Sequence, residues 1–186
     1  MVARVAAAWP ERLRRGVTIA VPPPAALAAG LMDPAQQQRL FYIFLFTVEG
    51  VAEAVLNADR RLVDYLWATW SPRLKDLGAH RDRVHAMYGD ERFIDNALKI
   101  YRANFDPGRF DPALVDFGGR SAAVASKPLL VLGGGDDGCI SPRMYAEAEK
   151  GLAAGSEVEV MARVGHFLHL EQPAAVAKRI LDWLSR

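Results

Sequence analysis

The chain has 186 residues, of which 51% are hydrophobic and 24% are charged, so its length suits one domain or a small domain with an insertion. Lys and Arg number 23 and Asp and Glu number 22, and the resulting net charge of +1 argues against a nucleic-acid-binding surface. A single cysteine, Cys139, excludes an internal disulfide and a zinc site built from several cysteines. The sequence has no long apolar stretch and no secretory signal, so we expect a soluble, cytoplasmic protein without membrane contact that acts on a small molecule.

The N-terminal residues predict a helix followed by a short strand. Apolar residues recur at near-helical spacing over residues 2–15, and Gly16 ends this helix. The helix begins without a capping residue, which is typical of a helix whose start has been removed. Val17–Val21 is rich in β-branched residues and precedes three prolines, which cannot continue a hydrogen-bonded ladder, so we expect the strand to end there.

Residues 33–105 are rich in aromatic residues and show helical patterns without a convincing strand. Asp33 precedes Pro34, which predicts a helix N-cap followed by proline at the first helical position. Gln38–Phe46 is apolar nearly all round, so we expect its helix to be buried on several sides. The segments that follow are predicted as a helix over residues 59–70, a polar linker from Ser71 to about Arg83 and an amphipathic helix over residues 90–105.

From Lys127 onward the pattern switches to alternating strands and helices. Residues 128–132 form a continuous apolar run, as expected for a strand that is buried on both faces of a parallel sheet. The later elements are predicted as a helix over residues 141–154, a strand over Val158–Val164 and a helix over residues 173–184. This order implies parallel strands joined by right-handed crossovers, so the predicted fold class is α/β.

Two of the predicted strands are followed by ionisable residues. Asp136 and Asp137 lie in residues 133–140, which we call the acid turn, and His166 lies in residues 165–170, which we call the histidine loop. Polar groups collect at the carboxyl ends of strands in an open parallel sheet, so a carboxylate and an imidazole can be hydrogen-bonded here. The carboxylate would then fix the tautomer of the imidazole and stabilise its protonated form. The alternative is a polar turn and a capping histidine without a chemical role.

The two segments resemble the α/β-hydrolase fold, and in particular its epoxide-hydrolase-like branch. The matching stretches read PLLVLGGGDDGCI at Pro128–Ile140 and GHFLHLEQP at Gly165–Pro173, and the spacing between them also fits. The resemblance implies that Asp137 is the acid of a catalytic triad and that His166 is its general base. Asp136 corresponds to a variable position of the family.

The helical middle of the chain resembles the lid, or cap, of the same branch. Residues 39–53 resemble the cap segment that carries one ring-opening tyrosine, at Tyr42, and residues 100–104 resemble the segment that carries the second, at Tyr101. Two phenol donors aimed at an epoxide oxygen would polarise the ring and stabilise the alkoxide that forms when a carboxylate attacks. The alternatives are that Tyr42 is a core aromatic residue and that Tyr101 lies on a helix surface.

Several neighbouring residues are predicted to have packing roles. Trp67 and Trp70 are interpreted as packing residues of the cap, with lining of the substrate pocket as the alternative, and His169 corresponds to a position that packs near the next helix. Gly133 stands where the family usually has His. Cys139 is interpreted as a small buried residue, because no Lys or Arg adjoins it in the sequence. The sequence has no metal-ligand cluster and no phosphate-binding glycine loop, so we expect neither a metal nor an organic cofactor.

The resemblance divides the chain into three parts. Residues 1–32 correspond to a truncated start of the core, residues 33–120 to the helical cap and residues 121–186 to the C-terminal core that carries the acid and the histidine. The predicted architecture is therefore a partial α/β-hydrolase fold, with about three parallel strands and flanking helices, plus an all-helical cap.

We find no nucleophile elbow, which is a sharp strand-to-helix turn of the form Gly-x-Asp/Ser-x-Gly. In the family it lies before the point that corresponds to Met1, and Ala3–Arg15 matches the rear of the helix that follows it. Segments beginning at Gly119 and Gly155 do not follow a strand with glycine on both sides of a nucleophile. We therefore expect the outer edge of Val17–Val21 to be unpaired and to favour self-association.

Two hypotheses for the function remain. In the first, the chain is the C-terminal part of an epoxide-hydrolase-like enzyme that converts an apolar epoxide to a diol through an Asp ester. Dehalogenation, which shares the Asp–His mechanism, and ester hydrolysis are the alternatives on the same fold. In the second, the chain as it stands is a non-catalytic fragment, because an acid–base pair without its nucleophile cannot run the two-step covalent mechanism.

Overall fold

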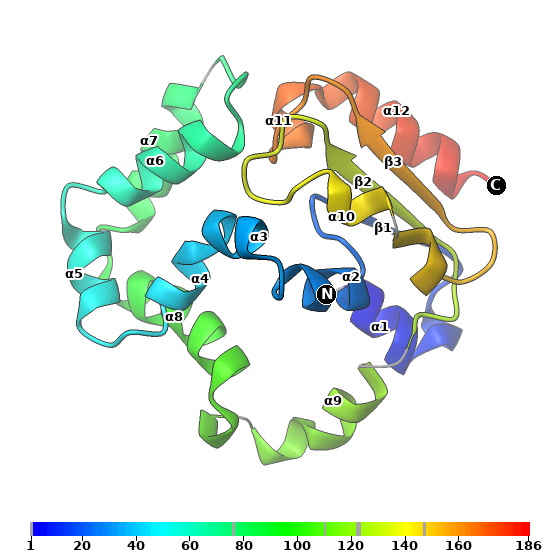
Figure 1. Cartoon of the computed structure of the whole chain (residues 1–186), viewed down its shortest axis with the longest axis horizontal. Coiled ribbons are helices and arrows are strands. Elements are labelled where there is room, and N and C mark those ends of the chain that lie inside the picture. The colour runs from blue at the N-terminus through cyan, green and yellow to red at the C-terminus, as the bar shows by residue number, and fades with distance from the viewer. Residues whose placement is uncertain (1, 76, 110, 122–123, 147) are drawn as a thin grey trace.

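The computed structural model describes residues 2–75, 77–109, 111–121, 124–146 and 148–186, and Figure 1 shows the arrangement of their elements. In chain order the elements are α1 (Val2–Ala8), η1 (Pro10–Arg12), β1 (Gly16–Ile19), α2 (Pro24–Gly30), α3 (Pro34–Arg39), α4 (Phe41–Leu45), α5 (Val51–Asn57), α6 (Arg61–Trp70), α7 (Leu77–Met87), α8 (Glu91–Phe105), η2 (Pro107–Arg109), η3 (Pro112–Leu114), α9 (Val115–Ser121), β2 (Leu129–Gly134), α10 (Arg143–Ala146), η4 (Ala148–Gly151), β3 (Glu157–Met161), α11 (Leu168–Glu171) and α12 (Pro173–Leu184). Within this described part of the chain, no helix is both long enough and apolar enough to cross a bilayer.

The three strands form one parallel sheet in the order β1-β2-β3. The register pairs Gly16 of β1 with Leu129 of β2, and Leu130 of β2 with Glu157 of β3. All six residues of the central strand β2 are buried, as its continuous apolar run predicted. The prediction of an α/β fold with three parallel strands and flanking helices is confirmed.

Two strands end earlier than predicted, each at a residue with a left-handed backbone. β1 stops at Ile19 rather than Val21, because Ala20 takes a φ of 56° that a strand cannot contain. β3 stops at Met161 rather than Val164, and Arg163 takes a φ of 57° in the turn that follows. These two turns direct the chain away from the carboxyl end of the sheet, and the second one leads into the histidine loop.

Each face of the sheet packs against a different set of helices. Leu130 and Leu132 of β2 point toward α12 and join a buried cluster around Trp183. The alternate residues, Leu129 and Val131, point to the opposite face and belong to a larger cluster that continues into the helical middle of the chain. Figure 1 shows α12 lying along one side of the strands and α3–α8 gathered on the other side of the molecule.

The predicted helix over residues 2–15 is wrong in its second half. The helix α1 ends at Ala8, because the residue before a proline avoids the α region, and Trp9 takes φ −139° and ψ 64° before Pro10. A single 3-10 turn follows. Further along the chain α9 packs against α1, where the rings of Trp9 and Phe117 stack with their centroids 5.0 Å apart.

The middle segment, which we define as residues 34–105, contains no strand among its described residues, as predicted. Asp33 caps α3 as predicted, since its carboxylate accepts a hydrogen bond from the Ala35 amide at 3.0 Å. The prediction of one helix over Gln38–Phe46, buried on several sides, is wrong. The helix breaks at Leu40, and Phe41 of α4 is 37% exposed, because α4 lies at the surface of the segment and buries only part of its circumference.

The predicted linker from Ser71 to about residue 83 is also wrong, since most of it belongs to α7. This helix lacks an apolar face that the sequence pattern could reveal. It is held against α6 by polar contacts, in which Asp64 lies 2.8 Å from Nε2 of His85 and 3.7 Å from Nε of Arg81. Polar contacts between helices leave no hydrophobic period in the sequence.

The C-terminal third agrees with prediction at its last helix and differs before it. The limits of α12, Pro173–Leu184, are those predicted, with proline at the first position. The predicted helix over residues 141–154 is wrong, because among the described residues of this range only the short α10 and the 3-10 turn η4 form. The helix α11, which begins within the histidine loop at Leu168, was not predicted.

Candidate active site

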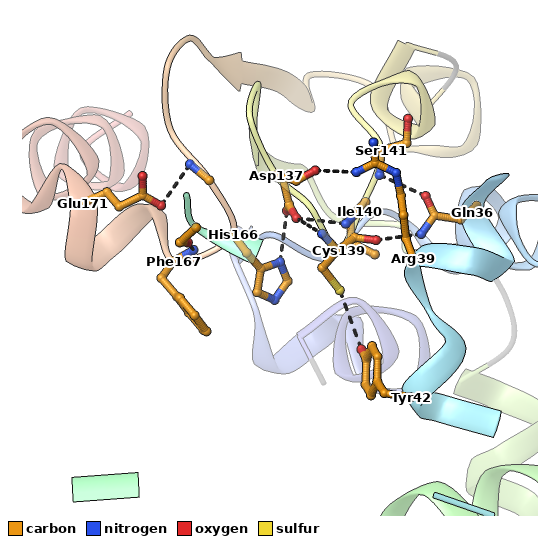
Figure 2. A network of polar contacts seen from close by, with 12 residues as sticks. Gln36, Arg39, Tyr42, Asp137, Cys139, Ile140, Ser141, His166, Phe167 and Glu171 are labelled. Carbon is orange, nitrogen blue, oxygen red and sulfur yellow. Dashed lines mark hydrogen bonds and ion pairs between the residues drawn. The ribbon is translucent and has the colours of Figure 1, made fainter. Parts of the chain in front are cut away.

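The acid turn orients the carboxylate of Asp137 toward His166. Asp137 is 2% exposed, and its Oδ1 accepts hydrogen bonds from the backbone amides of Cys139 at 2.7 Å and Ile140 at 2.9 Å. Its other oxygen, Oδ2, lies 3.0 Å from Nδ1 of His166 (Figure 2). Because the two amides occupy Oδ1, the carboxylate is fixed with Oδ2 facing the imidazole.

His166 is oriented by its contact with Asp137. The carboxylate of Asp137 accepts a hydrogen bond from Nδ1–H, which leaves the lone pair of Nε2 free to take a proton. The side chain of His166 is 19% exposed, while that of Asp137 is fully buried. The histidine reaches this position because the turn after β3 brings it beside the end of β2, where the backbone amide of Asp136 donates to the carbonyl of Val164 at 2.9 Å. The structure thus brings together Asp137 and His166, which lie 29 residues apart in the chain.

Two residues of α3 hold the acid turn from the other side, and sequence reasoning missed both. Gln36 is 1% exposed, and its amide group donates to the Cys139 carbonyl at 2.8 Å and accepts from the Ser141 amide at 2.9 Å. Arg39 donates to the carbonyl of Asp137 at 2.7 Å. Figure 2 shows both side chains reaching the turn from α3. No local signal marks these residues, because their partners lie about a hundred residues further along the chain.

The end of α6 contacts both loops, and its residues were also missed as site residues. The carbonyl of Trp70 accepts from the backbone amide of His166 at 2.8 Å, and the two rings lie with their centroids 5.1 Å apart. The hydroxyl of Ser71 accepts from the amide of Phe167 at 2.9 Å. Sequence analysis had assigned Trp70 a packing role and Ser71 the start of a linker.

The structure brings Tyr42 and Tyr101 together beside Cys139. The ring centroids of the two tyrosines are 6.0 Å apart, and Tyr42 also packs against Trp70 at 4.9 Å, which in turn contacts His166. The Tyr42 hydroxyl lies 3.6 Å from Sγ of Cys139 (Figure 2). Burial raises the pKa of both tyrosines above the usual range, because desolvation disfavours the phenolate form.

Cys139 and His169 lie near these groups in different environments. Cys139 is 1% exposed, so the prediction of a small buried residue is confirmed, and burial raises its thiol pKa to about 12. His169 lies at the surface on α11, which packs against α12. Partial burial lowers the pKa of His169, and the neighbouring His166 and His80 lower it further.

Residues 134–138 have the Gly-x-Asp-x-Gly spacing of a nucleophile elbow with Asp136 at its centre, a match that sequence analysis missed. The backbone there is not that of an elbow. Asp136 does not take a positive φ, and the next helix, α10, begins only at Arg143. The carboxylate of Asp136 is also engaged in an ion pair with Arg73. The segment is therefore an acid turn that places Asp137, and not a turn that presents Asp136 to a substrate.

Gly133, where the family usually has His, is covered by a buried aromatic ring. A Cβ atom at this position would lie 2.5 Å from Cε2 of Tyr145, which is 2% exposed. The ring of Tyr145 therefore occupies the space next to β2 that a side chain at residue 133 would need. Within the described ranges, no three His, Cys, Asp or Glu side chains are grouped so that they could hold a metal ion.

A cavity of about 280 Å³ opens between the acid turn and the middle segment. Its walls include Arg39, Trp70 and Gly138, so it borders the residues that hold Asp137 and His166 in place. Asp137, His166, Tyr42 and Tyr101 are not among the residues that line this cavity. A carboxylate and a histidine that meet at the carboxyl ends of neighbouring parallel strands are an arrangement found in hydrolases with an α/β fold.

The comparison with known families agrees with that class. The chain belongs to the α/β hydrolase family, whose model matches residues 1–179. No curated protein is similar enough to the chain to count as a match. The family likeness therefore comes from the family model and from solved structures.

Three solved structures illustrate the range of activities on this fold. A proposed epoxide hydrolase from Klebsiella pneumoniae has a TM-score of 0.75 and 19% identity, covering 96% of this chain and 61% of that chain. A proposed acyltransferase from Salmonella enterica has a TM-score of 0.76 and 18% identity, covering 98% and 59%. A haloalkane dehalogenase variant from Bradyrhizobium elkanii has a TM-score of 0.72 and 20% identity, covering 98% and 62%. At these identities the likeness shows the fold alone, and the chain spans about three fifths of the length of these structures.

Proposed function

We propose that the chain carries the acid–base pair and the cap of an epoxide-hydrolase-like site. In this reaction an Asp carboxylate attacks a ring carbon of an apolar epoxide, the carbon–oxygen bond breaks, and the oxygen takes a proton. Water activated by His166 then hydrolyses the ester to a diol. The observation that carries the proposal is the 3.0 Å contact between Asp137 and Nδ1 of His166, which leaves Nε2 free to accept a proton.

We assign the cap to residues 33–120 and the ring-opening donors to Tyr42 and Tyr101. Their closely packed rings support this assignment, because two phenol hydroxyls that lie near each other can donate to one alkoxide oxygen. The hydroxyl of Tyr42 contacts the thiol of Cys139, which is a weak acceptor, so an epoxide oxygen would be a better one.

A binding experiment tests the tyrosine assignment without requiring turnover. A small apolar amide offers a carbonyl oxygen in place of the epoxide oxygen, and its affinity for the chain can be measured by calorimetry. We expect Tyr42→Phe and Tyr101→Phe to weaken binding about tenfold each, which corresponds to one lost hydrogen bond of about 1.4 kcal/mol. Tyr88→Phe is the control, because the ring of Tyr88 packs against Phe93 and Tyr88 is not in the wall of the cavity beside the acid turn. Equal affinity in all three variants would contradict the assignment.

We further propose that the nucleophilic Asp is not among these residues and that the chain alone does not turn over epoxides. Asp136 is engaged with Arg73 and lacks the elbow backbone, which supports this view. The test is an assay of the chain and of His166→Ala with styrene oxide. We expect no diol above the uncatalysed background from either protein. Diol formation that disappears in His166→Ala would refute the proposal of an inactive fragment.

Dehalogenation and ester hydrolysis are the competing activities on the same fold. Dehalogenation requires donors that bind a halide, and ester hydrolysis requires a Ser nucleophile. The pair Tyr42 and Tyr101 favours the epoxide reaction, because two phenol donors suit a single developing alkoxide. Bromide that competes with the amide for the chain would favour dehalogenation instead.

We also propose that the outer edge of β1 mediates self-association. A cavity of about 460 Å³ lies along this edge, with Val17, Thr18 and Val21 in its wall, and Val21 is 51% exposed. An unpaired strand edge beside an apolar cavity is a ready surface for a second chain. We expect a concentration-dependent dimer in analytical ultracentrifugation that Val21→Lys weakens. The control is Val115→Lys, at a 64% exposed position on α9, and a monomer at all concentrations would contradict the proposal.

A further inference from the structure

The C-terminal end of α6 joins the acid turn to the histidine loop. The carbonyl oxygen of Trp70 accepts two backbone hydrogen bonds, from the amide of His166 at 2.8 Å and from the amide of Gly138 at 3.3 Å. The two donors belong to different loops, which follow different strands. One carbonyl group therefore ties together the segments that carry the base and its carboxylate partner.

Ser71 adds a side-chain contact to the same junction. Ser71 is 2% exposed, and its hydroxyl oxygen accepts from the amide of Phe167, the residue after His166, at 2.9 Å. Without this hydroxyl the amide would be left in a buried position without a partner, which is costly. The loop would regain a partner for that amide only by shifting, and His166 would shift with it.

Glycines at both loops allow this close approach. A Cβ atom at Gly138 would lie 2.0 Å from the carbonyl oxygen of Thr69, and one at Gly165 would lie 2.6 Å from Cα of Ser71. Side chains at these positions would push α6 away from the sheet. The two glycines thus act with Ser71 to bring α6 into backbone contact with both loops.

A third contact fixes α6 to the acid turn. The guanidinium group of Arg73 forms an ion pair with Asp136, the residue before Asp137, and both side chains are partly exposed. At their base the loops are already joined by the bond from the Asp136 amide to the Val164 carbonyl. The contacts from the end of α6 join the same two loops at Gly138 and His166, close to the imidazole.

We infer that Trp70, Ser71 and Arg73 form a clamp, the α6 clamp, and that Ser71 is a positioning residue that keeps Nδ1 of His166 against Asp137. Its catalytic meaning rests on the proposed function, in which His166 is the base. The positioning of His166 by Ser71 does not rest on the proposed function, because the hydrogen bond between His166 and Asp137 can be observed without turnover. A movement of α6 would change this hydrogen bond directly.

Nuclear magnetic resonance of the full chain tests the clamp. We expect a low-field proton signal from Nδ1–H of His166 and slow hydrogen exchange at the amides of His166 and Phe167. In Ser71→Ala we expect the low-field signal to broaden beyond detection and the Phe167 amide to lose its protection. Ser71→Thr keeps a hydroxyl and should keep both features.

Ser121→Ala is the matched control for a general loss of stability. Ser121 is also buried, at 6% exposure, and its hydroxyl donates to the Gly118 carbonyl within α9 at 3.0 Å. We expect Ser121→Ala to leave the His166 signal and the Phe167 protection unchanged. Equal losses of the His166 signal and of the Phe167 protection in Ser71→Ala and Ser121→Ala would overturn the inference. A Phe167 amide that exchanges freely in the unmodified chain would also overturn it.

Arg73→Gln provides a second variant in case Ser71→Ala fails to fold. The side chain of Arg73 is 58% exposed, so its replacement spares the core. We expect the low-field signal to weaken, whereas Arg92→Gln, which removes a comparable exposed pair with Asp90 on α8, should not affect it. An unchanged signal in Arg73→Gln and Ser71→Ala alike would refute the clamp. A chain that passes this test but binds the amide equally well in Tyr42→Phe and Tyr101→Phe retains the clamp and loses the proposed function, so the two proposals fail separately.

Discussion

The two faces of the sheet are built from different kinds of contact. Toward α12 the buried cluster is apolar throughout, with Trp183 and Leu168 fully buried against alternate residues of β2. Toward the middle segment the larger cluster surrounds buried polar side chains. Those beside the acid turn, the histidine loop and α5 are Gln36, Ser71, Asp137 and Arg102.

The α12 face mainly stabilises the fold, whereas the face toward the middle segment positions the ionisable groups of the candidate site. Apolar contacts have no preferred direction, so most contacts of the α12 face contribute free energy without orienting a group. The hydrogen bond from Nε1 of Trp183 to the Gly16 carbonyl is an exception. Buried polar groups are costly unless their hydrogen bonds are made, and those bonds have fixed geometry. The face toward the middle segment buries such polar groups, and their hydrogen bonds hold Asp137 and His166 in one arrangement.

The largest loss of stability is expected from a substitution on the α12 face. Trp183→Ala removes a fully buried ring and the hydrogen bond from its Nε1 to the Gly16 carbonyl at 3.0 Å. We expect a loss of about 3–5 kcal/mol in the free energy of unfolding, measured with urea. Leu181→Ala on the same helix is the control, because Leu181 is 67% exposed. Similar losses in the two variants would mean that α12 does not form this core.

The next effect tests the polar face. Gln36→Met keeps the volume of the side chain but leaves the Cys139 carbonyl and the Ser141 amide without their partners. We expect a loss of about 3 kcal/mol, since each buried unpaired group costs about 1–3 kcal/mol. Gln37→Met, at the exposed neighbouring position, should change stability much less. If both variants unfold at the same urea concentration, the contacts of Gln36 do not hold the acid turn.

A smaller loss in the free energy of unfolding is expected when the pH is raised above 9. Burial raises the pKa of Cys139 from 9.0 to about 12, so the unfolded chain loses its thiol proton at a lower pH than the folded chain. The unfolded state therefore binds fewer protons above pH 9, and stability falls as the pH rises from 9 toward 12. Between pH 9 and pH 10 we expect Cys139 to account for a loss of about 1 kcal/mol.

Cys139→Ala supplies the comparison for this pH dependence. The variant lacks the thiol, so its stability should change less over the same interval, whatever its stability at pH 7. The buried tyrosines have an ordinary pKa of 10.0 that burial raises, so they add a fall of the same sign in both proteins. Parallel curves for the two proteins in urea unfolding at each pH would show that Cys139 is not buried on the polar face.

The smallest effect concerns the turn between the two faces. Arg163 takes a φ of 57° just before Val164, which belongs to the α12 face, and before His166, which faces α6. Arg163→Gly should raise the free energy of unfolding by about 0.5 kcal/mol, because glycine adopts this backbone without strain. The same substitution at Arg92 in α8 should lower it. A decrease at both positions would contradict the left-handed turn, and thermal unfolding is a sufficient measurement.

The elements that the sequence predicted well are those with a strong local pattern. The buried strand β2, the helix α12 and the N-cap at Asp33 have apolar periods or capping residues that depend only on near neighbours. The polar helix α7 has no such period, and the break at Leu40 depends on which side of α4 meets the rest of the fold. These features could be decided only by packing between distant segments.

The sequence by itself determined the α/β class, the family and the two segments that carry Asp137 and His166, because each segment directly follows a strand and keeps its motif within a few residues. Only the tertiary structure decided which groups hold that pair. Ser71 and Phe167 lie 96 residues apart, and Gln36 and Cys139 lie 103 residues apart, so no local pattern relates them. Their hydrogen bonds form because folding excludes water from the face toward the middle segment, where a buried polar group without a partner is costly.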